Sequence, residues 1–167
     1  ASDVYKRQRH ECFNAETAKF YLCEVFLALS YIHEHGYVYR DLKPENVLLS
    51  SAGDGPIQIK ICDFGLSVAL AQDGKLSEKQ GTWAYWAPEM FGDSRYSGKE
   101  VDMWSLGVIA FELLTLRRPF ETNNMATLIH KVMHCERPED ARVISRTKIA
   151  PASGMPMKVV SAPAAPA

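Results

Sequence analysis

The spacing of apolar residues near the start of the chain predicts an amphipathic helix. Asn14 is a candidate N-cap, and Glu16 in the first turn would complement the positive end of the helix dipole. Gly36 marks the expected end of the helix, because glycine commonly terminates helices. Between these positions apolar residues recur at steps of three and four, at Ala18, Leu22, Val25, Leu29 and Ile32.

Two short strands are predicted next. Residues 47–49 are apolar, and residues 57–61 alternate apolar and polar side chains. The intervening residues 50–56 contain two glycines and a proline, so the two strands are expected to form a hairpin. Residues 63–89 hold further glycines and show little periodicity, which indicates a loop-like segment.

The second half of the chain predicts two more helices and a tail. Residues 101–116 are apolar on nearly every side, the pattern of a helix buried all round, and residues 125–134 form a candidate short helix. Beyond Arg137 prolines and alanines dominate and no apolar face is visible, so we expect residues 138–167 to be a disordered tail. The predicted fold class is mainly α with a small β-hairpin.

Composition narrows the classes of function. The 167 residues fit one domain, and the net charge of −1 gives no reason to expect nucleic acid or an anionic membrane as a partner. The longest apolar run, residues 104–116, is shorter than the roughly 18 residues of a membrane span. The four cysteines are scattered, which favours reduced thiols in the cytoplasm or the nucleus.

Two short segments carry the candidate chemistry. The first contains Asp41, Lys43 and Asn46, and the second begins with Asp63. Asp41 can accept a hydrogen bond from an incoming hydroxyl, and Lys43 can reach a phosphate from the same side. Asn46 and Asp63 offer the hard oxygen ligands that Mg²⁺ prefers. Together they predict transfer of a phosphoryl group from ATP, with ATP and Mg²⁺ as the cofactors.

These motifs resemble those of eukaryotic protein kinases. Residues 9–137 are similar to the large, C-terminal lobe of that family, and residues 1–8 form a leader that does not match it. The matching motifs are the catalytic loop at 39–46, Asp-Phe-Gly at 63–65, Ala-Pro-Glu at 87–89 and the start of the central helix at 102–107. Lys-Pro-Glu-Asn at 43–46 and Gly-Thr at 81–82 follow the serine/threonine pattern, and Tyr39 in place of the usual His resembles the AGC group.

The resemblance implies a role for each site residue. Asp41, Lys43 and Thr82 would be catalytic, with Thr82 hydrogen-bonded to the other two. Asn46 and Asp63 would bind the metal, and Leu48 would lie beneath the adenine. Asp102 would brace the backbone of the catalytic loop from below, and Tyr39 and Phe64 would stack on one another. The nucleotide-binding set is Lys43, Glu45, Asn46, Leu48 and Asp63.

The resemblance also suggests how a protein substrate bearing Ser or Thr would be selected. Glu45 and Glu112 match positions that pair with an arginine upstream of the target hydroxyl in some relatives. Both acids recur in kinases with other preferences, so the arginine preference stays open. Trp83 and Trp86 would line the pocket for the residue after the target, which favours an apolar residue there.

The activation segment departs from the AGC pattern at one position. Glu78 stands where these kinases usually carry a phosphorylated threonine, and its carboxylate could meet Arg40. The alternative is a solvated Glu78 with Ser77 as the phosphorylation site. Gly65 belongs to the metal-binding motif that begins this segment, and Glu89 ends it. In the family that glutamate pairs with a later arginine, for which Arg142 and Arg146 are candidates.

The sequence has no match to the glycine-rich loop, strand lysine or helix glutamate of a kinase small lobe. We therefore expect a large lobe without its N-terminal lobe: a fragment of an active kinase that is itself inactive alone. The alternative is a non-catalytic binding or scaffold module. His33 and His35 are expected only to complement the end of the first helix.

Overall fold

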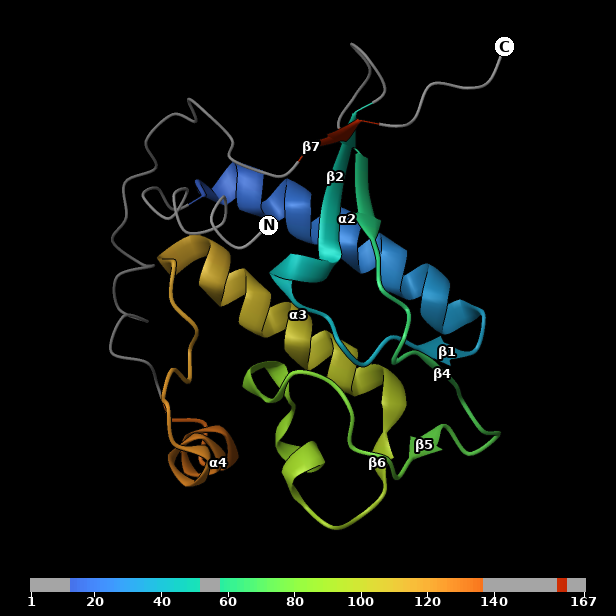
Figure 1. Cartoon of the computed structure of the whole chain (residues 1–167), viewed down its shortest axis with the longest axis vertical. Coiled ribbons are helices and arrows are strands. Elements are labelled where there is room, and N and C mark those ends of the chain that lie inside the picture. Colours follow the sequence, from blue (N-terminus) through green and yellow to red (C-terminus); the bar gives the residue numbers. More distant parts are fainter. Residues whose placement is uncertain (1–12, 52–57, 137–158, 162–167) are drawn as a thin grey trace.

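Three α-helices make up most of the regular structure in the part of the chain that is described. The computed structural model describes residues 13–51, 58–136 and 159–161. The helices are α2 (Ala15–Glu34), α3 (Gly98–Thr115) and α4 (Met125–Met133), and α2 and α3 run alongside one another (Figure 1). The prediction of a mainly α fold with a small β-hairpin is confirmed.

The start and end of α2 follow the predicted signals. The Asn14 side chain accepts a hydrogen bond from the backbone N–H of Thr17 at 2.8 Å, which caps the helix. The helix ends at Glu34, and Gly36 takes a positive φ of 78°. Both features agree with the predicted N-cap and helix end.

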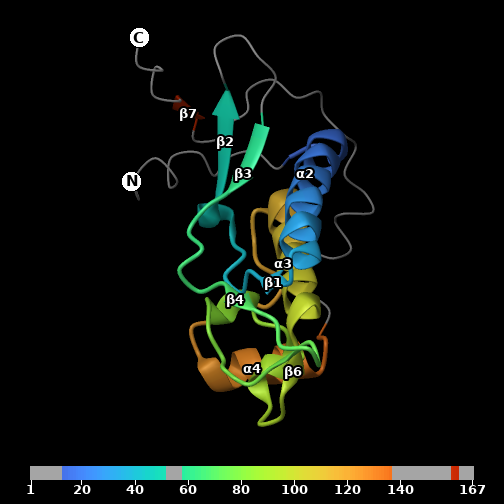
Figure 2. The ribbon, with the colours of Figure 1, turned by 90° about the vertical axis from the view of Figure 1, so that its right-hand side faces the viewer.

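The main core lies between α2, α3 and the chain that connects them. Val25 and Leu29 of α2 are buried against Ile109 and Leu113 of α3. Tyr39 and Leu42 belong to the same cluster, so the segment that carries Asp41 is anchored by apolar side chains on both sides of it. This packing places a polar loop on a rigid support. Figure 2 shows α2 and α3 together on one side of this loop, with α4 at the opposite end from the hairpin.

The predicted hairpin is present as β2 (Val47–Ser51) and β3 (Gln58–Ile61). The strands are antiparallel, with Val47 opposite Ile61. A third strand, β7 (Val159–Ser161), pairs in parallel with β2. It falls inside residues 138–167, which were expected to be disordered. Most of that tail, the leader 1–8 and the hairpin turn lie outside the described residues, so the domain bounds stay predictions.

Residues 63–89 contain short elements where a continuous loop was predicted. Two-residue strands and single 3₁₀ turns are too short to leave a readable period in the sequence. The paired strands are β1 (Tyr37–Val38) with β4 (Val68–Ala69), and β5 (Lys75–Leu76) with β6 (Tyr96–Ser97); the turns are η1 (Pro44–Asn46), η2 (Trp83–Tyr85) and η3 (Pro88–Phe91).

Helix α3 begins at Gly98, earlier than the predicted residue 101. A Cβ atom at Gly98 would lie 2.7 Å from the Val38 side chain and 2.6 Å from the Leu70 side chain. Glycine therefore allows the helix to start in close contact with β1 and with Leu70, which directly follows β4. Among the described residues, no helix is long and apolar enough to cross a membrane.

Candidate active site

A buried carboxylate on α3 holds the backbone of the loop between β1 and η1. Asp102 is fully buried, with 0% exposure. Its Oδ2 accepts a hydrogen bond from the Tyr39 N–H at 2.9 Å, and its Oδ1 accepts one from the Arg40 N–H at 2.8 Å. Arg40 takes a positive φ of 71°, a strained conformation for a residue with a side chain. The two hydrogen bonds thus secure the bend that precedes Asp41, the brace implied by the resemblance.

Asp41, Lys43 and Thr82 meet in one hydrogen-bonded network. Lys43 Nζ donates to Asp41 Oδ2 at 2.6 Å and to Thr82 Oγ1 at 3.0 Å. The Thr82 hydroxyl and the Thr82 backbone N–H both donate to Asp41 Oδ1, at 2.7 and 2.9 Å. Each carboxylate oxygen of Asp41 therefore faces a donor, and residues far apart in the sequence converge on one acid.

The network also sets the charge of Asp41. Burial alone would raise the pKa of the Asp41 carboxyl, but the hydrogen bonds from Lys43 and Thr82 outweigh that effect and hold the pKa below its ordinary value. Asp41 is therefore an anion at neutral pH. It can accept a hydrogen bond from a hydroxyl that approaches the site.

The base of the hairpin brings the two predicted metal ligands to neighbouring places. The Cys62 N–H donates to the Asn46 carbonyl at 2.9 Å, so Asp63 follows directly after a residue paired with Asn46. The Asn46 amide nitrogen donates to the Asp41 backbone carbonyl at 3.0 Å, which leaves the amide oxygen as the ligand atom. Asp63 is exposed, and its Oδ1 accepts from the Gly65 N–H at 3.3 Å. Two oxygen donors of this kind fit Mg²⁺.

Asp63 is the predicted site residue that joins the network least directly. Among the described residues, no hydrogen bond of the Asp63 side chain joins it to Asp41, Lys43 or Thr82. Its backbone has a positive φ of 61°, which turns the chain at this point. Asn46 is thus hydrogen-bonded to Asp41, and Asp63 lies beside them across the hairpin.

Tyr39 and Phe64 contact one another, as the resemblance implied. Their rings pack edge to face with centroids 5.3 Å apart. The Tyr39 hydroxyl donates to the Cys62 carbonyl. Burial raises the pKa of Tyr39, so the hydroxyl keeps its proton and remains a donor. Leu48 is partly buried in β2, between Val47 and Leu49, which belong to the core.

The two acids predicted to select the substrate lie near the same tyrosine. Tyr85 donates through its hydroxyl to Glu112 Oε2 at 2.8 Å. Burial raises the pKa of Tyr85, and the carboxylates of Glu112 and Glu45 raise it further. Glu45 is exposed and Glu112 is partly buried, so both can add negative charge at this surface.

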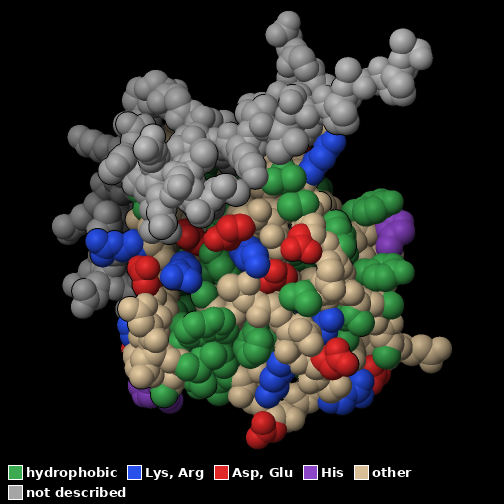
Figure 3. Space-filling model, viewed as in Figure 1, with side chains coloured by type: hydrophobic (Ala, Val, Ile, Leu, Met, Phe, Trp, Pro, Cys, Tyr) green, Lys and Arg blue, Asp and Glu red, His purple; other side chains and the backbone are tan. Residues whose placement is uncertain are grey.

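The predicted apolar pocket includes two tryptophans around η2. Trp83 is exposed, and Trp86 is partly buried with its ring 5.5 Å from the ring of Phe91. Figure 3 shows hydrophobic side chains gathered below a central group of charged side chains on this face. Tyr85, which donates to Glu112, lies between Trp83 and Trp86 in the sequence, so the segment with the two tryptophans also contacts one of the two acids.

In the activation segment, Glu78 lies within ion-pair distance of Arg40. Glu78 Oε2 is 3.8 Å from Arg40 Nη1, but the Glu78 side chain is 74% exposed whereas that of Arg40 is 7% exposed. The Tyr96 hydroxyl donates to the Glu78 carbonyl, which fixes the backbone here. Glu89 is exposed, and its candidate partners Arg142 and Arg146 lie outside the described residues.

Comparison with known proteins assigns the family. Residues 2–159 match the protein kinase domain. This chain belongs to the protein kinase domain family. The resemblance drawn from the motifs is thereby confirmed.

Several protein kinases are similar to this kinase domain. Ribosomal protein S6 kinase alpha-6 of Danio rerio is 48% identical over 121 residues, which cover 71% of this chain and 16% of the relative. Serine/threonine-protein kinase SCH9 of Candida albicans is 46% identical over 118 residues, covering 70% of this chain and 14% of the relative. Developmentally-regulated protein kinase 1 of Dictyostelium discoideum is 39% identical over 130 residues, covering 77% and 18%. The chain thus spans less than a fifth of each.

The kinase domain also contains contacts around the catalytic loop that sequence reasoning missed. His33 was expected only to complement the end of α2, yet its ring Nε2 lies 2.8 Å from Asp102 Oδ2. Gly81 lies so close to the catalytic loop that a Cβ atom there would be 2.2 Å from the Arg40 carbonyl oxygen. No spacing rule connects either residue to the loop, because both contacts depend on tertiary packing.

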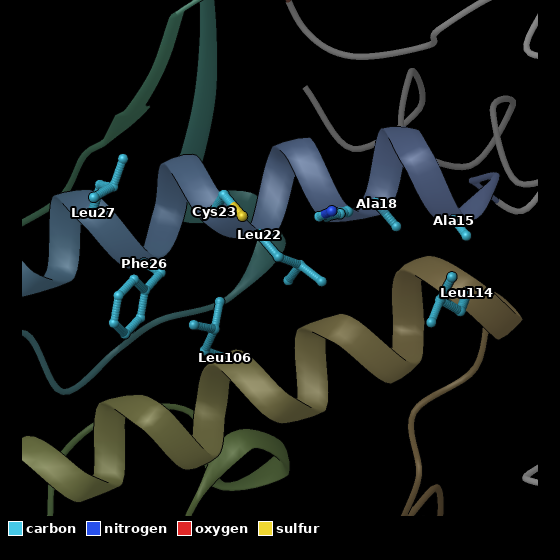
Figure 4. A pocket seen from close by; sticks show the side chains of 9 residues that line it. Ala15, Ala18, Leu22, Cys23, Phe26, Leu27, Leu106 and Leu114 are labelled. Carbon is cyan, nitrogen blue, oxygen red and sulfur yellow. The ribbon is translucent and has the colours of Figure 1, made fainter.

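An apolar groove of the kinase domain lies apart from these residues. It has a volume of ≈ 660 Å³ and opens between α2 and α3 (Figure 4). Its walls come mainly from α2, including Leu22, Phe26 and Leu27, with Leu106 and Leu114 of α3. None of the predicted site residues lines it, so its shape says nothing about nucleotide binding.

Proposed function

We propose that this kinase domain carries the large-lobe chemistry of a serine/threonine protein kinase. The observation that carries the proposal is the network in which Lys43 and Thr82 hold an ionised Asp41. Asp41 accepts the proton of a substrate Ser or Thr hydroxyl, whose oxygen forms a bond to the γ-phosphorus of ATP. The bond from that phosphorus to the β,γ-bridging oxygen breaks and ADP leaves.

The remaining polar groups would stabilise the charge of the phosphates. Lys43 presents an ammonium group beside Asp41, where it can contact the transferring phosphoryl group. Asn46 and Asp63 would hold Mg²⁺, which neutralises phosphate charge when it is bound. Glu45 and Leu48 complete the proposed nucleotide-binding set.

The proposed substrate is a protein segment with an arginine upstream of the target hydroxyl and an apolar residue after it. The proximity of Glu45 and Glu112 to Tyr85 supports the first preference, because a guanidinium group can pair with carboxylates in two-pronged geometry. Trp83 and Trp86 support the second. The scattered spacing of the four cysteines supports a cytoplasmic or nuclear location.

We further propose that the activity requires a small lobe and that the 167 residues alone turn over negligibly. A kinase holds the α- and β-phosphates with a lysine from that lobe, and these residues offer no match to it. A non-catalytic scaffold is the alternative. The hydrogen bonds around Asp41 favour the enzyme, since docking alone does not require a charged, oriented acid.

Radiolabelled-ATP assays on the longer polypeptide that carries this segment test the proposal. The wild type should phosphorylate a Ser/Thr peptide, and Asp41→Asn should lower kcat by about 100-fold or more. Asp93→Asn is the matched control, because the Asp93 side chain is exposed and outside the network. Absence of kinase activity in the wild type would support the scaffold, and full activity of Asp41→Asn would contradict the role proposed for Asp41.

Two further measurements test the substrate preference and the need for a small lobe: the KM for variant peptides and the turnover of the isolated chain. A peptide with Arg upstream of the target should have a KM roughly tenfold lower than one with Ala there, and Glu112→Gln should narrow that gap. Turnover near ~1 s⁻¹ by the isolated chain would contradict the need for a small lobe.

A further inference from the structure

The hairpin strand β2 has strand partners on both of its edges. On one edge it pairs with β3, antiparallel and in register from Val47 to Ser50. On the other edge it pairs in parallel with β7, so β2 is the central strand of a three-stranded sheet. Figures 1 and 2 show β7 beside the end of β2 that lies away from α4. The outer edge of β2, formed by Leu49, Ser50 and Ser51, is therefore covered by a segment from much later in the chain.

The parallel direction of β7 indicates that it docks as a separate segment. Strands joined by a tight turn are antiparallel, as β2 and β3 are, whereas parallel strands need a longer connection. The chain passes from β2 to β3, so the outer edge of β2 takes no part in the hairpin itself. The backbone N–H and C=O groups at such an edge form a template for an extended chain. The outer edge of β2 thus has the properties of a strand-addition site.

The alternation of backbone groups along β2 predicts which of them face β7. The Cys62 N–H donates to the Asn46 carbonyl at the base of the hairpin, so the backbone of Asn46 faces the β3 side. Backbone groups that point to the same neighbouring strand recur at every second residue. The residues between them, Leu49 and Ser51, should therefore direct their N–H and C=O groups toward β7.

Val160 is the residue of β7 that we expect to bond to both of these positions. Its two neighbours, Val159 and Ser161, lie opposite Leu49 and Ser51. In a parallel ladder each residue bonds to the residues that flank its partner, so the Val160 N–H should donate to the Leu49 carbonyl. The Ser51 N–H should likewise donate to the Val160 carbonyl. One residue of β7 is thus expected to carry two of the main-chain contacts.

The sequence around β7 favours a short extended segment. Val159 and Val160 are β-branched, and β-branched residues are enriched in strands. Pro156 and Pro163 stand on either side of them, and proline cannot donate a hydrogen bond to a strand ladder. The part of the chain that can add to β2 is therefore confined to the few residues between the two prolines.

We propose that the outer edge of β2 is a docking site for an extended segment, and that Val159–Ser161 of the same chain occupies it. The segment is recognised through its main chain, in parallel register, and it covers an edge that would otherwise be open to other chains. The register includes neither Leu48 nor any residue that we assign to the reaction. The inference is therefore independent of the proposed function.

Amide hydrogen exchange of the 167-residue chain, followed by NMR, tests the docking. Val160→Pro removes the N–H that should bond to the Leu49 carbonyl, whereas Val160→Ala keeps it. Val160→Pro should speed exchange at the Leu49 and Ser51 amides about tenfold, and Val160→Ala should retain most of the protection. Ala165→Pro is the matched control, because it introduces the same residue beyond β7. It should leave both amides unchanged.

The same spectra separate loss of β7 from loss of the hairpin. The Leu48 and Ser50 amides should face β3, so their exchange should be the same in Val160→Pro as in the wild type. Equal acceleration at all four amides, or unchanged exchange at Leu49 and Ser51, would overturn the proposal. If Val160→Pro does not fold, nuclear Overhauser spectra of the wild type decide. Contacts between the backbone protons of Leu49 and Val160 support the docking, and their absence refutes it.

A mixed sample distinguishes docking within one chain from exchange of the strand between two copies. Chains labelled with ¹⁵N and chains labelled with ¹³C are unfolded, combined and refolded together. Contacts between the ¹⁵N-labelled Ser51 amide and a ¹³C-labelled Val160 should be absent, and their presence would show that a second copy supplies the strand and would contradict the proposal. Full activity of Asp41→Asn in the kinase assay would contradict the proposed function and leave these results unchanged.

Discussion

Asp41 combines two properties that usually oppose one another, burial and charge. The side chain is buried, yet donors from Lys43 and Thr82 face both of its oxygens. Charge-assisted hydrogen bonds of this kind are about twice as strong as neutral ones. The acid is therefore held in one orientation without losing its proton-accepting form.

This arrangement predicts how stability depends on pH. The pKa of Asp41 is lower in the folded chain than in the unfolded chain, so its stabilising effect is present above the unfolded value of about 4 and is lost as the pH falls through the folded value. Urea unfolding should give a constant difference in free energy between wild type and Asp41→Asn from pH 7 to about pH 5. The difference should shrink below about pH 4, and a difference that grows there would contradict the assignment.

The contact between Glu78 and Arg40 predicts a modest effect on activity. An exposed ion pair contributes up to about 1 kcal/mol, so Glu78→Gln in the longer polypeptide should lower kcat by less than about fivefold. Glu78→Arg should lower it further, because it places two cations together. Unchanged activity in Glu78→Arg would remove the idea that this carboxylate imitates a phosphate, and a loss of activity in Ser77→Ala would favour the alternative phosphorylation site.

At the residue scale, the sequence motifs predicted the residues of the candidate active site well, but they did not predict all of the residues that support it. Asp41, Lys43, Asn46 and Thr82 fall in short segments whose residue order itself carries the chemistry. His33 lies on a separate helix and meets Asp102 only after α2 and α3 have packed. A side chain of this kind leaves no local signal in the sequence, because its contact exists only in the folded chain.

Among the elements, the activation segment and the catalytic loop come into close contact at Gly81. This residue has a φ of 106°, and a Cβ atom there would lie 2.2 Å from the Arg40 carbonyl oxygen. Gly74 also has a positive φ, 67°, but no atom lies within 4 Å of its Cβ position. A comparison of the two positions therefore distinguishes the effect of backbone strain from the effect of a steric clash between elements.

Alanine at these two positions should have different effects. Gly74→Ala should cost about 1–2 kcal/mol of unfolding free energy, the usual strain of a left-handed residue. Gly81→Ala should cost about 3 kcal/mol or more, since the clash with backbone adds to the strain. Chemical denaturation of both variants provides the comparison, and equal losses would show that the close approach is not required.

The length of an element determines whether it could be predicted from the sequence. The helix at Ala15–Glu34 and the hairpin strands each repeat a pattern over several residues, and both were predicted with small errors at their ends. The strands at Tyr37–Val38 and Lys75–Leu76 have only two residues. Their partners lie elsewhere in the sequence, so pairing rather than local preference creates them.

For the whole molecule, the groove between α2 and α3 is lined by both buried and exposed side chains. Leu106 is 7% exposed and belongs to the core, whereas Leu27 is 61% exposed. Leu106→Ala should lower the free energy of unfolding by about 2–4 kcal/mol. Leu27→Ala should change it by less than about 0.5 kcal/mol, as for other surface substitutions. Thermal unfolding of both variants measures this, and a large loss in Leu27→Ala would mean that the groove is covered in solution.

The open groove has a thermodynamic consequence. Hydrocarbon that is already hydrated in the native state contributes nothing to the heat-capacity increase on unfolding. The heat-capacity change on unfolding of the isolated chain should therefore be below the usual ~12–15 cal/mol/K per residue. Its free energy of unfolding should accordingly depend less steeply on temperature. Any segment that covers these leucines would increase the heat-capacity change on unfolding. Calorimetry can therefore detect such a segment before it is identified.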